Sequence, residues 1–363
     1  MNEKIPSHMA AVHLVRHGGL EALCYREDIA TPVAGQESVL IKVAAAGINN
    51  TDINTRVGWY SKKVRDSTNT GGETGFELSD DEDSAWSDEP IAFPRIQGAD
   101  CCGTIVGVGK GVPPSRVGER VIVRSMMHGV DNHPFECRTF GSECDGAFAQ
   151  YTTAPSRETH KVDCHWSDAE LASIPCAYST AENMLHRASV GPERVLVTGA
   201  SGGVGSAAVQ LAKRRGSHVT AVASASKTRS LLALGADEVI DRNTPLVDAL
   251  GTGHFDVVID LVAGPAWPSL LEILKRGGRY ATAGAIAGPL VELDVRTLYL
   301  KDLTLIGCTF QENVVFENLV RYIEHDEIRP VVAKTFPLRD IRKAQVEFLA
   351  KKFTGKLVLI PPA

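Results

Sequence analysis

The feature of this sequence that most constrains its fold is a glycine-rich turn between an apolar segment and an amphipathic one. RVLVTGA, from Arg194 to Ala200, predicts a buried strand, and SAAVQLAKRRG, from Ser206 to Gly216, predicts a helix. The glycines at this junction are Gly199, Gly202, Gly203 and Gly205. Glycine lets the backbone turn tightly and approach a pyrophosphate, whose charge then meets the free N–H groups at the helix N-terminus. We therefore expect a bound dinucleotide here, and the alternative is a tight turn without a ligand.

The segments that follow alternate between strand-like and helix-like patterns. The strands are HVTAVA, DEVIDR, FDVVIDLV, RYATAG and LTLIGC, and the helices between them include TRSLLALGA and PAWPSLLEILKRG. Continuous apolar strands separated by helices indicate a parallel sheet covered on both faces. Before Arg194 the chain contains short alternating strands instead, the clearest being VLIKVAAAGI from Val39 to Ile48. The sequence thus predicts an α/β chain with a doubly wound Rossmann domain and a mostly β domain.

Length, charge and cysteine content narrow the class of protein. A chain of 363 residues exceeds one ordinary core, so we expect two domains. The net charge of −6 argues against a nucleic-acid surface, which needs a concentrated basic face. No run of about 18 apolar residues is present, and MNEKIPSHMAAV at the start lacks the apolar stretch of a secretion signal. We expect a cytoplasmic protein with eight free cysteines that binds neither nucleic acid nor membrane.

One segment, Asp66 to Pro94, differs in composition from the rest. It contains no Lys or Arg and nine carboxylates, those of Asp66, Glu73, Glu77, Asp80, Asp81, Glu82, Asp83, Asp88 and Glu89. Such composition predicts a long flexible loop. Phe76, Leu78 and Trp86 are the side chains that would anchor it.

The end of the second Rossmann strand distinguishes NAD from NADP. NAD sites place an Asp or Glu about 20 residues after the glycines, where it holds the ribose 2′-hydroxyl. The corresponding stretch here is AVASASKTR, with no acid at Ala223, Ser224 or Ala225. The polar side chains present are those of Ser224, Ser226, Lys227 and Arg229. Hydroxyls and positive charge suit a 2′-phosphate, so we predict NADPH, against the alternative of a solvated polar turn.

The motifs taken together resemble the medium-chain dehydrogenase/reductase superfamily, most closely its quinone oxidoreductase (ζ-crystallin-like) branch. The most specific match is ASGGVGSAAVQLAK, from Ala200 to Lys213. Supporting matches are AAAGINNTDINTRVGWY, IQGADCCGTIVGVG, GAFAQY, IPCAYSTAENML, GGRYATAG and FTGKLVLIP. The resemblance implies a GroES-like catalytic domain at residues 1–165, a Rossmann NADP-binding domain at 166–308 and a return to the catalytic domain at 309–363. It also implies catalysis in the cleft between the two domains.

The resemblance also bears on metal binding. Zinc-dependent relatives hold a catalytic zinc with a Cys in a GICxTD-like segment, a His in GHE and a later Cys. Here Asn49 and Ala99 stand at the first two positions, Asp100 replaces the Glu, and Cys176 alone matches. Because catalytic zinc needs three protein ligands, we predict no metal at this place. The relatives' four closely spaced structural cysteines are also absent, and the loose cluster of His128, His133, Cys137 and Cys144 is interpreted as loop residues, a metal site being the alternative.

The same resemblance assigns candidate site residues. Asn49 would orient a substrate carbonyl and Tyr60 would donate a hydrogen bond or proton, the alternatives being a turn residue and a wall residue. Asp52 and Arg56 are interpreted as a structural pair, and Cys176 as a residue of the pocket floor. The expected cofactor-binding residues are Thr180, Asn183, Ala200, Ser201, Gly202, Gly203, Val204, Gly205, Ser224, Ser226, Lys227, Gly284 and Lys356.

The function implied is an NADPH-dependent, zinc-independent reduction of quinones or α,β-unsaturated carbonyls, acting on a small-molecule substrate. An alcohol or aldehyde dehydrogenase of the same superfamily and a non-catalytic dinucleotide-binding sensor stay open as alternatives. LTLIGC, from Leu303 to Cys308, is an apolar final strand, and the resemblance implies that two such edges pair in a homodimer or homotetramer. The acidic segment lies between stretches that line the family's cleft, so we interpret it as a lid, or else as a surface excursion that aids solubility.

Overall fold

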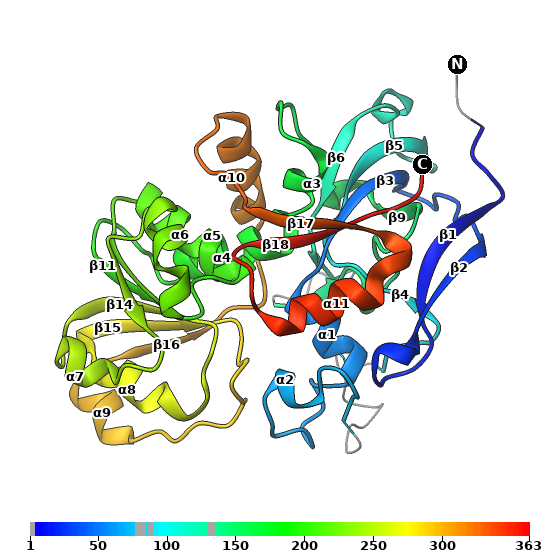
Figure 1. Cartoon of the computed structure of the whole chain (residues 1–363). Helices are drawn as coiled ribbons and strands as arrows, with labels where there is room; N and C mark the ends of the chain where they lie inside the picture. Colours follow the sequence, from blue (N-terminus) through cyan, green and yellow to red (C-terminus); the bar gives the residue numbers. More distant parts are fainter. Residues whose placement is uncertain (1–3, 77–84, 86–89, 130–134) are drawn as a thin grey trace.

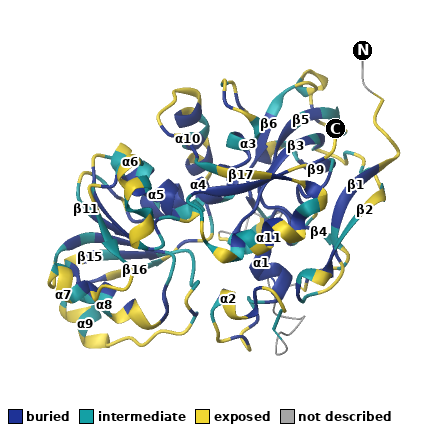
Figure 2. Ribbon diagram, in the orientation of Figure 1, coloured by how far each residue is buried: buried dark blue, intermediate teal, exposed yellow. Residues whose placement is uncertain are grey.

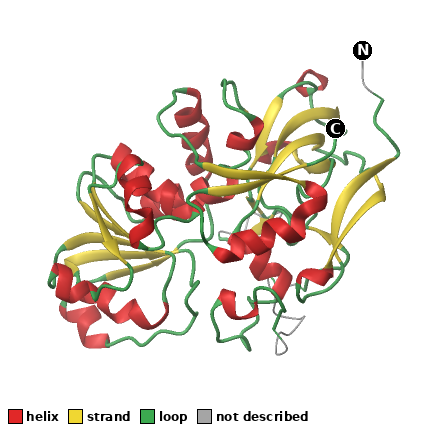
Figure 3. Ribbon diagram, viewed as in Figure 1, coloured by secondary structure: helices red, strands yellow, loops and turns green. Residues whose placement is uncertain are grey.

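The structure, a computed structural model, describes residues 4–76, 85, 90–129 and 135–363. Figure 1 shows two lobes, with the Rossmann domain on the left and the β-rich catalytic domain on the right. Both lobes consist of buried strands with helices packed beside them, as Figures 2 and 3 show. No helix among the described residues is both long enough and apolar enough to cross a membrane.

The Rossmann lobe contains a six-stranded parallel sheet in the order β13-β12-β11-β14-β15-β16. Its strands are β11 (Arg194–Val197), β12 (His218–Ala223), β13 (Glu238–Asp241), β14 (Phe255–Asp260), β15 (Leu274–Thr282) and β16 (Thr304–Gly307). The helices of this lobe are α4 (Pro175–Arg187), α5 (Gly203–Arg214), α6 (Thr228–Ala233), α7 (Leu246–Leu250), α8 (Trp267–Glu272), α9 (Val295–Leu300) and α10 (Asn313–Glu324). The strand order reverses between β11 and β14, the point at which doubly wound sheets bind ligands.

Successive residues of the central strand face two separate cores. Val195 and Val197 of β11 pack with α4 and α5, whereas Leu196 packs with Leu270 and Leu271 of α8. Continuous apolar strands are therefore required because both faces of the sheet are covered by helices. The predicted doubly wound fold is confirmed.

The catalytic lobe is built around a seven-stranded sheet. Its order is β10-β6-β5-β3-β18-β17, with β9 pairing β3 off this path. The strands are β3 (Ser38–Gly47), β5 (Cys102–Val108), β6 (Arg120–Val123), β9 (Tyr151–Pro155), β10 (Thr159–Lys161), β17 (Val332–Pro337) and β18 (Lys356–Ile360). Smaller sheets join β2 (Leu23–Ala30), β1 (His8–Leu14) and β4 (Arg95–Ile96), and β7 (Met126–His128) with β8 (Cys137–Thr139). The helices are α1 (Asn50–Val57), α2 (Thr68–Gly71), α3 (Asp168–Leu171) and α11 (Ile341–Ala350).

The C-terminal segment completes the catalytic sheet after the Rossmann domain. β18 pairs antiparallel with β3, at Val358 opposite Gly47, and parallel with β17. The preceding helix, α10, places Phe316, Leu319 and Ile323 in the same hydrophobic core as α4 and α5. The chain therefore re-enters the catalytic sheet at β17.

Part of the acidic segment is packed against the catalytic lobe. A Cβ on Gly71 would lie 2.6 Å from the Phe76 ring, so this ring covers α2. The Gly72 carbonyl accepts a hydrogen bond from the buried Arg56 side chain at 2.5 Å. This stretch is ordered by side-chain and backbone contacts, although composition alone predicted a flexible loop. Leu78, Trp86 and most of the carboxylates lie outside the described residues.

Candidate active site

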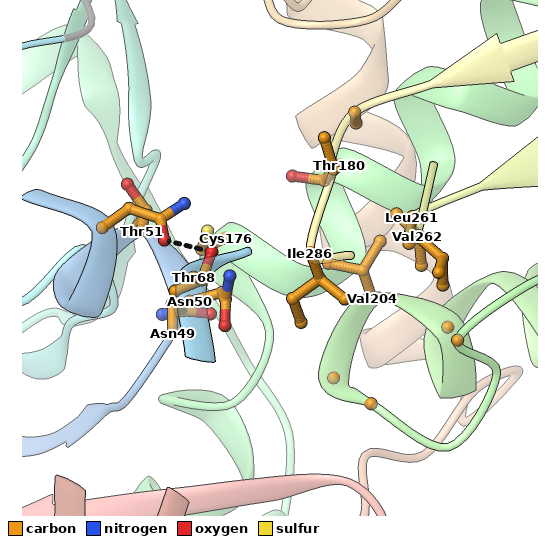
Figure 4. A pocket seen from close by; sticks show the side chains of 18 of the residues that line it. Asn49, Asn50, Thr51, Thr68, Cys176, Thr180, Val204, Leu261, Val262 and Ile286 are labelled. Atoms are coloured by element: carbon orange, nitrogen blue, oxygen red, sulfur yellow. Dashed lines mark hydrogen bonds between the residues drawn. The ribbon is translucent and has the colours of Figure 1, made fainter. Parts of the chain in front are cut away.

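A pocket between the two lobes brings together most of the residues that the sequence singled out. From the catalytic lobe it is lined by Ile48, Asn49, Asn50, Thr51, Asn54, Trp59, Tyr60, Thr68, Met126, Thr139, Phe348, Lys351 and Lys356. From the Rossmann side it is lined by Cys176, Thr180, Gly199, Gly202, Gly203, Val204, Gly205, Leu261, Val262, Ala283, Gly284, Ala285, Ile286, Cys308 and Thr309. Figure 4 shows Asn49, Thr51 and Cys176 facing Val204 and Ile286 across this space.

The glycine-rich turn forms the Rossmann wall of the pocket. Gly199 has a φ of 57°, and a Cβ on Gly205 would lie 2.2 Å from the Gly199 carbonyl oxygen, so both positions require glycine. Gly202 is the N-cap of α5, and a Cβ there would meet only one atom within 4 Å, at 3.4 Å. The first turn of α5 carries N–H groups that have no partner within the helix, and the backbone beside it is open at Gly202, which fits a dinucleotide diphosphate.

Lys356 lies on the catalytic side of this turn and is almost fully buried. Its ammonium lies 2.8 Å from Asp100 Oδ2 and donates to Asn49 Oδ1 at 2.5 Å and to the Ile48 carbonyl at 2.9 Å. These three acceptors use all three N–H groups of the ammonium. A Cβ on Gly203 would lie 2.9 Å from Lys356 Cδ, so the glycine is also needed for the lysine to pass α5.

Asp100 connects this ammonium to two other elements. The residue is fully buried in the loop between β4 and β5. Its Oδ2 accepts a second hydrogen bond from Asn49 Nδ2 at 2.8 Å, and its Oδ1 accepts one from the Cys176 backbone N–H at 2.6 Å. Asp100 thus satisfies a donor in the first turn of α4, the helix that carries Cys176 and Thr180.

The Asn49 amide is held on both sides by this network. Its Nδ2 donates to Asp100 and, at 3.5 Å, to the Gly47 carbonyl, while its Oδ1 accepts from Lys356. Asn49 also caps α1, where its backbone N–H donates to Asp52 Oδ2 at 2.7 Å. The side chain lines the pocket, but its polar atoms are committed to the protein. This setting differs from the carbonyl-orienting role that the sequence suggests.

Asp52 and Arg56, expected as a structural pair, bind different partners. Burial and the nearby Asp100 carboxylate raise the pKa of Asp52 to about 7. The Arg56 guanidinium donates to the carbonyls of Gly18 and Gly72 and to Gln345 Oε1, and burial lowers its pKa to about 10. Both side chains fix α1 in place, each through its own contacts.

Tyr60 places a hydroxyl on the catalytic wall of the pocket. α1 ends at Gly58 in the left-handed conformation, and the chain then turns through Trp59 to Tyr60. The half-buried Tyr60 hydroxyl donates to Thr51 Oγ1 at 3.0 Å. Thr68, from the acidic segment, also lines the pocket, and its hydroxyl donates to Asn54 Oδ1 at 2.9 Å.

The remaining predicted cofactor residues divide into two groups. Thr180 and Gly284 line the pocket, whereas the buried Asn183 donates to the Phe310 carbonyl at 3.0 Å and does not. Ala200 is buried in the turn, and the Ser201 carbonyl accepts from the Gly355 N–H at 3.1 Å. Asn183 therefore supports the segment that carries Cys308 and Thr309 into the pocket.

The turn after β12 carries Ser224, Ser226 and Lys227, and it lies beyond the pocket lining. The two serine hydroxyls are 3.2 Å apart, and Lys227 Nζ donates to the Lys352 carbonyl at 2.5 Å. The Asp241 carboxylate at the end of β13 accepts from the Ala225 N–H at 2.8 Å. Sequence reasoning missed this acid because it examined the end of the second strand only, and β13 pairs beside β12.

A second pocket lysine, Lys351, was also missed. It follows the last helical residue of α11 with a φ of 52°, a position usually taken by glycine or asparagine. Its ammonium lies 3.3 Å from Asn50 Oδ1 and 3.8 Å from the centre of the Phe348 ring. In the sequence, the one feature that could have indicated Lys351 is its position directly after the last residue of helix α11.

Cys176 is the residue of the described pocket lining that matches a zinc ligand of the family. Among the described parts of the chain, no three His, Cys, Asp or Glu side chains are grouped so as to hold a metal. Burial raises the pKa of the Cys176 thiol. The nearby Asp100 carboxylate is paired with the Lys356 ammonium and accepts a hydrogen bond from the Asn49 amide. In the looser cluster, His128 lies opposite Cys137 in the β7–β8 pair and bonds the Gln311 carbonyl at 2.9 Å, and His133 lies outside the described residues.

Comparison with known proteins agrees with both lobes. The model of the alcohol dehydrogenase GroES-like domain matches residues 35–164, and that of the zinc-binding dehydrogenase matches residues 203–325. Human quinone oxidoreductase is 28% identical over 97% of this chain and 98% of its own length. Acryloyl-coenzyme A reductase from Metallosphaera sedula is 31% identical over 74% of this chain and 84% of its own length.

Solved structures show the same relationship. A Sinorhizobium meliloti protein described as an alcohol dehydrogenase superposes with a TM-score of 0.88 at 43% identity, covering 99% of this chain and 98% of that one. Similarity to these proteins thus extends along nearly the whole chain. It includes the glycine-rich turn, the strand β18 that pairs with β3, and the residues that line the pocket. This chain is an oxidoreductase that belongs to the medium-chain dehydrogenase/reductase superfamily, in its quinone oxidoreductase-like branch.

Proposed function

We propose that this chain is an NADPH-dependent reductase of quinones or α,β-unsaturated carbonyl compounds that works without zinc. The observation that carries the proposal is a buried network of three side chains. The Lys356 ammonium pairs with the Asp100 carboxylate, and the Asn49 amide hydrogen-bonds to both. Asn49 and Ala99 stand at two of the family's three zinc-ligand positions, so Cys176 alone matches, and zinc catalysis needs three protein ligands. Activation of the substrate must then come from hydrogen-bond donors.

Tyr60 is the donor we assign to the substrate. The nicotinamide, when bound, supplies a hydride to the electron-poor carbon, and negative charge develops on the carbonyl oxygen. The Tyr60 hydroxyl lies on the pocket wall and donates to Thr51 Oγ1 at 3.0 Å. Rotation about its C–O bond directs the same proton toward an oxygen in the pocket. Asn49 acts as a positioning residue, since its amide fixes the Lys356 ammonium.

The cofactor is assigned to the groups that the Rossmann lobe presents. The turn from Gly202 to Gly205 would hold the diphosphate, and Thr180 and Gly284 would flank the nicotinamide. Lys227, with the serines before it, would bind the 2′-phosphate, although its ammonium already donates to the Lys352 carbonyl. The Asp241 carboxylate, bonded to the same turn, opposes this preference through its charge.

Relatives support the reaction class. Quinone oxidoreductase and acryloyl-coenzyme A reductase are both names of enzymes that reduce an electron-poor conjugated system, and both are similar to most of this chain. The edge strand β16 supports a homodimer, since Leu305 there and Val295, Tyr299 and Leu300 on α9 are exposed apolar side chains.

The test is NADPH oxidation across quinones, enones and aldehydes. We expect turnover with quinones or enones, and a Tyr60→Phe variant should lose about 100-fold in kcat, the lower end of what a proton donor contributes. Tyr25→Phe is the matched control, because Tyr25 loses a hydroxyl that bonds Glu27 on β2, away from the pocket. Equal kcat values for wild type and Tyr60→Phe would contradict the assignment of Tyr60 as the hydrogen-bond donor to the substrate.

A second candidate is an alcohol or aldehyde dehydrogenase, favoured by the description of the Sinorhizobium meliloti relative. Activity confined to alcohols and abolished by chelators would support it against our proposal. Tight NADPH binding without turnover of any of these substrates would instead indicate a dinucleotide-binding sensor.

A further inference from the structure

One of the two pocket lysines, Lys351, has no carboxylate partner among the described residues that line the pocket. Among the described residues that line it there are two lysines and no carboxylate. The Lys356 ammonium is paired with Asp100 at 2.8 Å. The Lys351 ammonium contacts the Asn50 amide oxygen and the Phe348 ring, and burial is the one cause that lowers its pKa to about 7. In its protonated form Lys351 therefore carries a positive charge that the described residues around it leave without a counter-charge.

The backbone at Lys351 is also in an unfavourable conformation. A φ of 52° brings the Cβ of an L-residue close to its own carbonyl, and glycine would avoid this strain. A lysine here carries both the strain and the cost of partly burying an ammonium. Strained positions that persist in a pocket point to a role in ligand binding.

The chain around Lys351 leads directly to the cofactor turn. After Lys351 the Lys352 carbonyl accepts from Lys227, the Thr354 hydroxyl lies 3.2 Å from that of Ser230, and the Gly355 N–H donates to the Ser201 carbonyl. Figure 1 shows this segment, between α11 and β18, turning beside the Rossmann lobe. Lys351, at the end of α11 of the catalytic lobe, thus lines the same pocket as the glycine-rich turn of the Rossmann lobe.

We propose that Lys351 is an oxyanion-binding residue of this pocket, which holds a phosphate or carboxylate group from the side of the catalytic lobe. Two sources can supply that group. One is the diphosphate of the dinucleotide, to which the first turn of α5 would offer neutral N–H groups. The other is an acidic group on the substrate, and this source rests on the proposed function.

The experiment compares Lys351→Gly and Lys351→Asn, which both fit the left-handed backbone, with the charge-keeping Lys351→Arg. Lys343→Gln is the control, because Lys343 is an exposed lysine of α11 that pairs with Asp340 and does not line the pocket. Thermal unfolding should show that the glycine variant is at least as stable as wild type. Calorimetry then measures binding of NADPH and of adenosine 2′-phosphate, a probe that lacks the diphosphate.

If the diphosphate is the ligand, the Gly and Asn variants should bind NADPH at least about tenfold more weakly, and Lys351→Arg should keep most of the affinity. Binding of adenosine 2′-phosphate should not change. If the substrate is the source, NADPH affinity stays constant, and acetylacrylate binds the NADP⁺ complex about tenfold more weakly while its methyl ester is unaffected.

Equal affinities of wild type and both neutral variants for NADPH and for acetylacrylate would overturn the proposal. All these readings are equilibrium titrations, so they hold even if the enzyme reduces no enone or quinone. Failure of the proposed function would show separately, as absence of turnover in the wild-type protein.

Discussion

The Lys356 ammonium and the Asp100 carboxylate form an ion pair of 2.8 Å in which neither side chain reaches solvent. The pair joins β18 at the end of the chain to the loop before β5 near its beginning. Through the Cys176 N–H it also reaches α4 of the other lobe. One carboxylate therefore contacts β18 through Lys356 and α4 through Cys176, and both elements contribute residues to the pocket lining.

Removing one partner of this pair should be costly. Asp100→Asn leaves the ammonium buried without its counter-charge, and we expect a loss of about 3–5 kcal/mol in the free energy of unfolding, measured by urea denaturation. The double variant Asp100→Asn with Lys356→Met should lose less than the sum of the two single variants, since no charge is then left unpaired. Strictly additive losses would mean that the pair contributes no coupling.

Cofactor preference should depend on Lys227. We expect NADPH to bind more tightly than NADH, and Lys227→Ala to weaken NADPH binding by about 1–3 kcal/mol while changing NADH binding little, as measured by fluorescence titration. Equal affinities of the wild-type protein for the two cofactors would contradict this expectation.

The Asp241 carboxylate offers a paired variant for the same titration. Asp241→Asn removes negative charge from the turn that carries Ala225 and Lys227, so the preference for NADPH should increase. If the substitution mainly weakens NADH binding, Asp241 acts on the ribose hydroxyls instead, and the enzyme is suited to NAD.

Metal content provides a direct check on the site. With Asn49 and Ala99 in place of ligands, the purified protein should carry far less than one zinc per chain, and dialysis against a chelator should leave its activity unchanged. Metal analysis that finds one or two tightly held zinc ions would require a different mechanism.

The assembly prediction rests on β16. This strand is the edge of the six-stranded sheet, and Leu305 on it is 38% exposed. We expect a homodimer, or a tetramer of such dimers, by light scattering, and a Leu305→Lys substitution should shift it toward the monomer. Lys343→Gln is the matched control, because Lys343 is exposed on α11 of the other lobe and pairs with Asp340. A monomeric wild-type protein at working concentration would refute the prediction.

Stability should depend on pH through Lys351. Burial lowers its pKa from 10.5 to about 7 in the folded protein. Between these values the unfolded chain holds a proton that the folded chain has released, so the contribution of Lys351 to stability rises as pH increases from 7 toward 10. The difference in melting temperature between Lys351→Gly and wild type should therefore shrink over this range in the absence of ligand. A difference that does not change with pH would indicate that the ammonium is solvated.

The fold could be predicted from the sequence because its signals are local. Gly199 to Gly205 form one continuous stretch, and each apolar strand of the Rossmann sheet is recognisable from a few adjacent residues. The site could be predicted only in part. Asn49, Tyr60 and Lys356 were identified through the family pattern, and all three line the pocket.

What sequence reasoning missed depends on contacts between distant segments. The Asn49 amide is bound by Asp100 and Lys356, which lie 51 and 307 residues away, so its availability to a substrate was not visible in the sequence. Asp241 reaches the Ala225 turn because two strands are neighbours in the sheet. Lys351 lines the pocket because α11 ends where the chain passes beside the Rossmann lobe on its way to β18.

The return of β18 to β3 has a consequence for how the protein is made on the ribosome. Chains fold largely from the N-terminus as they are synthesised, and the whole Rossmann domain precedes Lys356 in the chain. The glycine-rich turn can therefore form while the catalytic sheet still lacks its sixth and seventh strands, β17 and β18. We therefore expect the nascent protein to complete its Rossmann domain before its catalytic sheet, so that the pocket is complete only when Lys356 reaches Asp100.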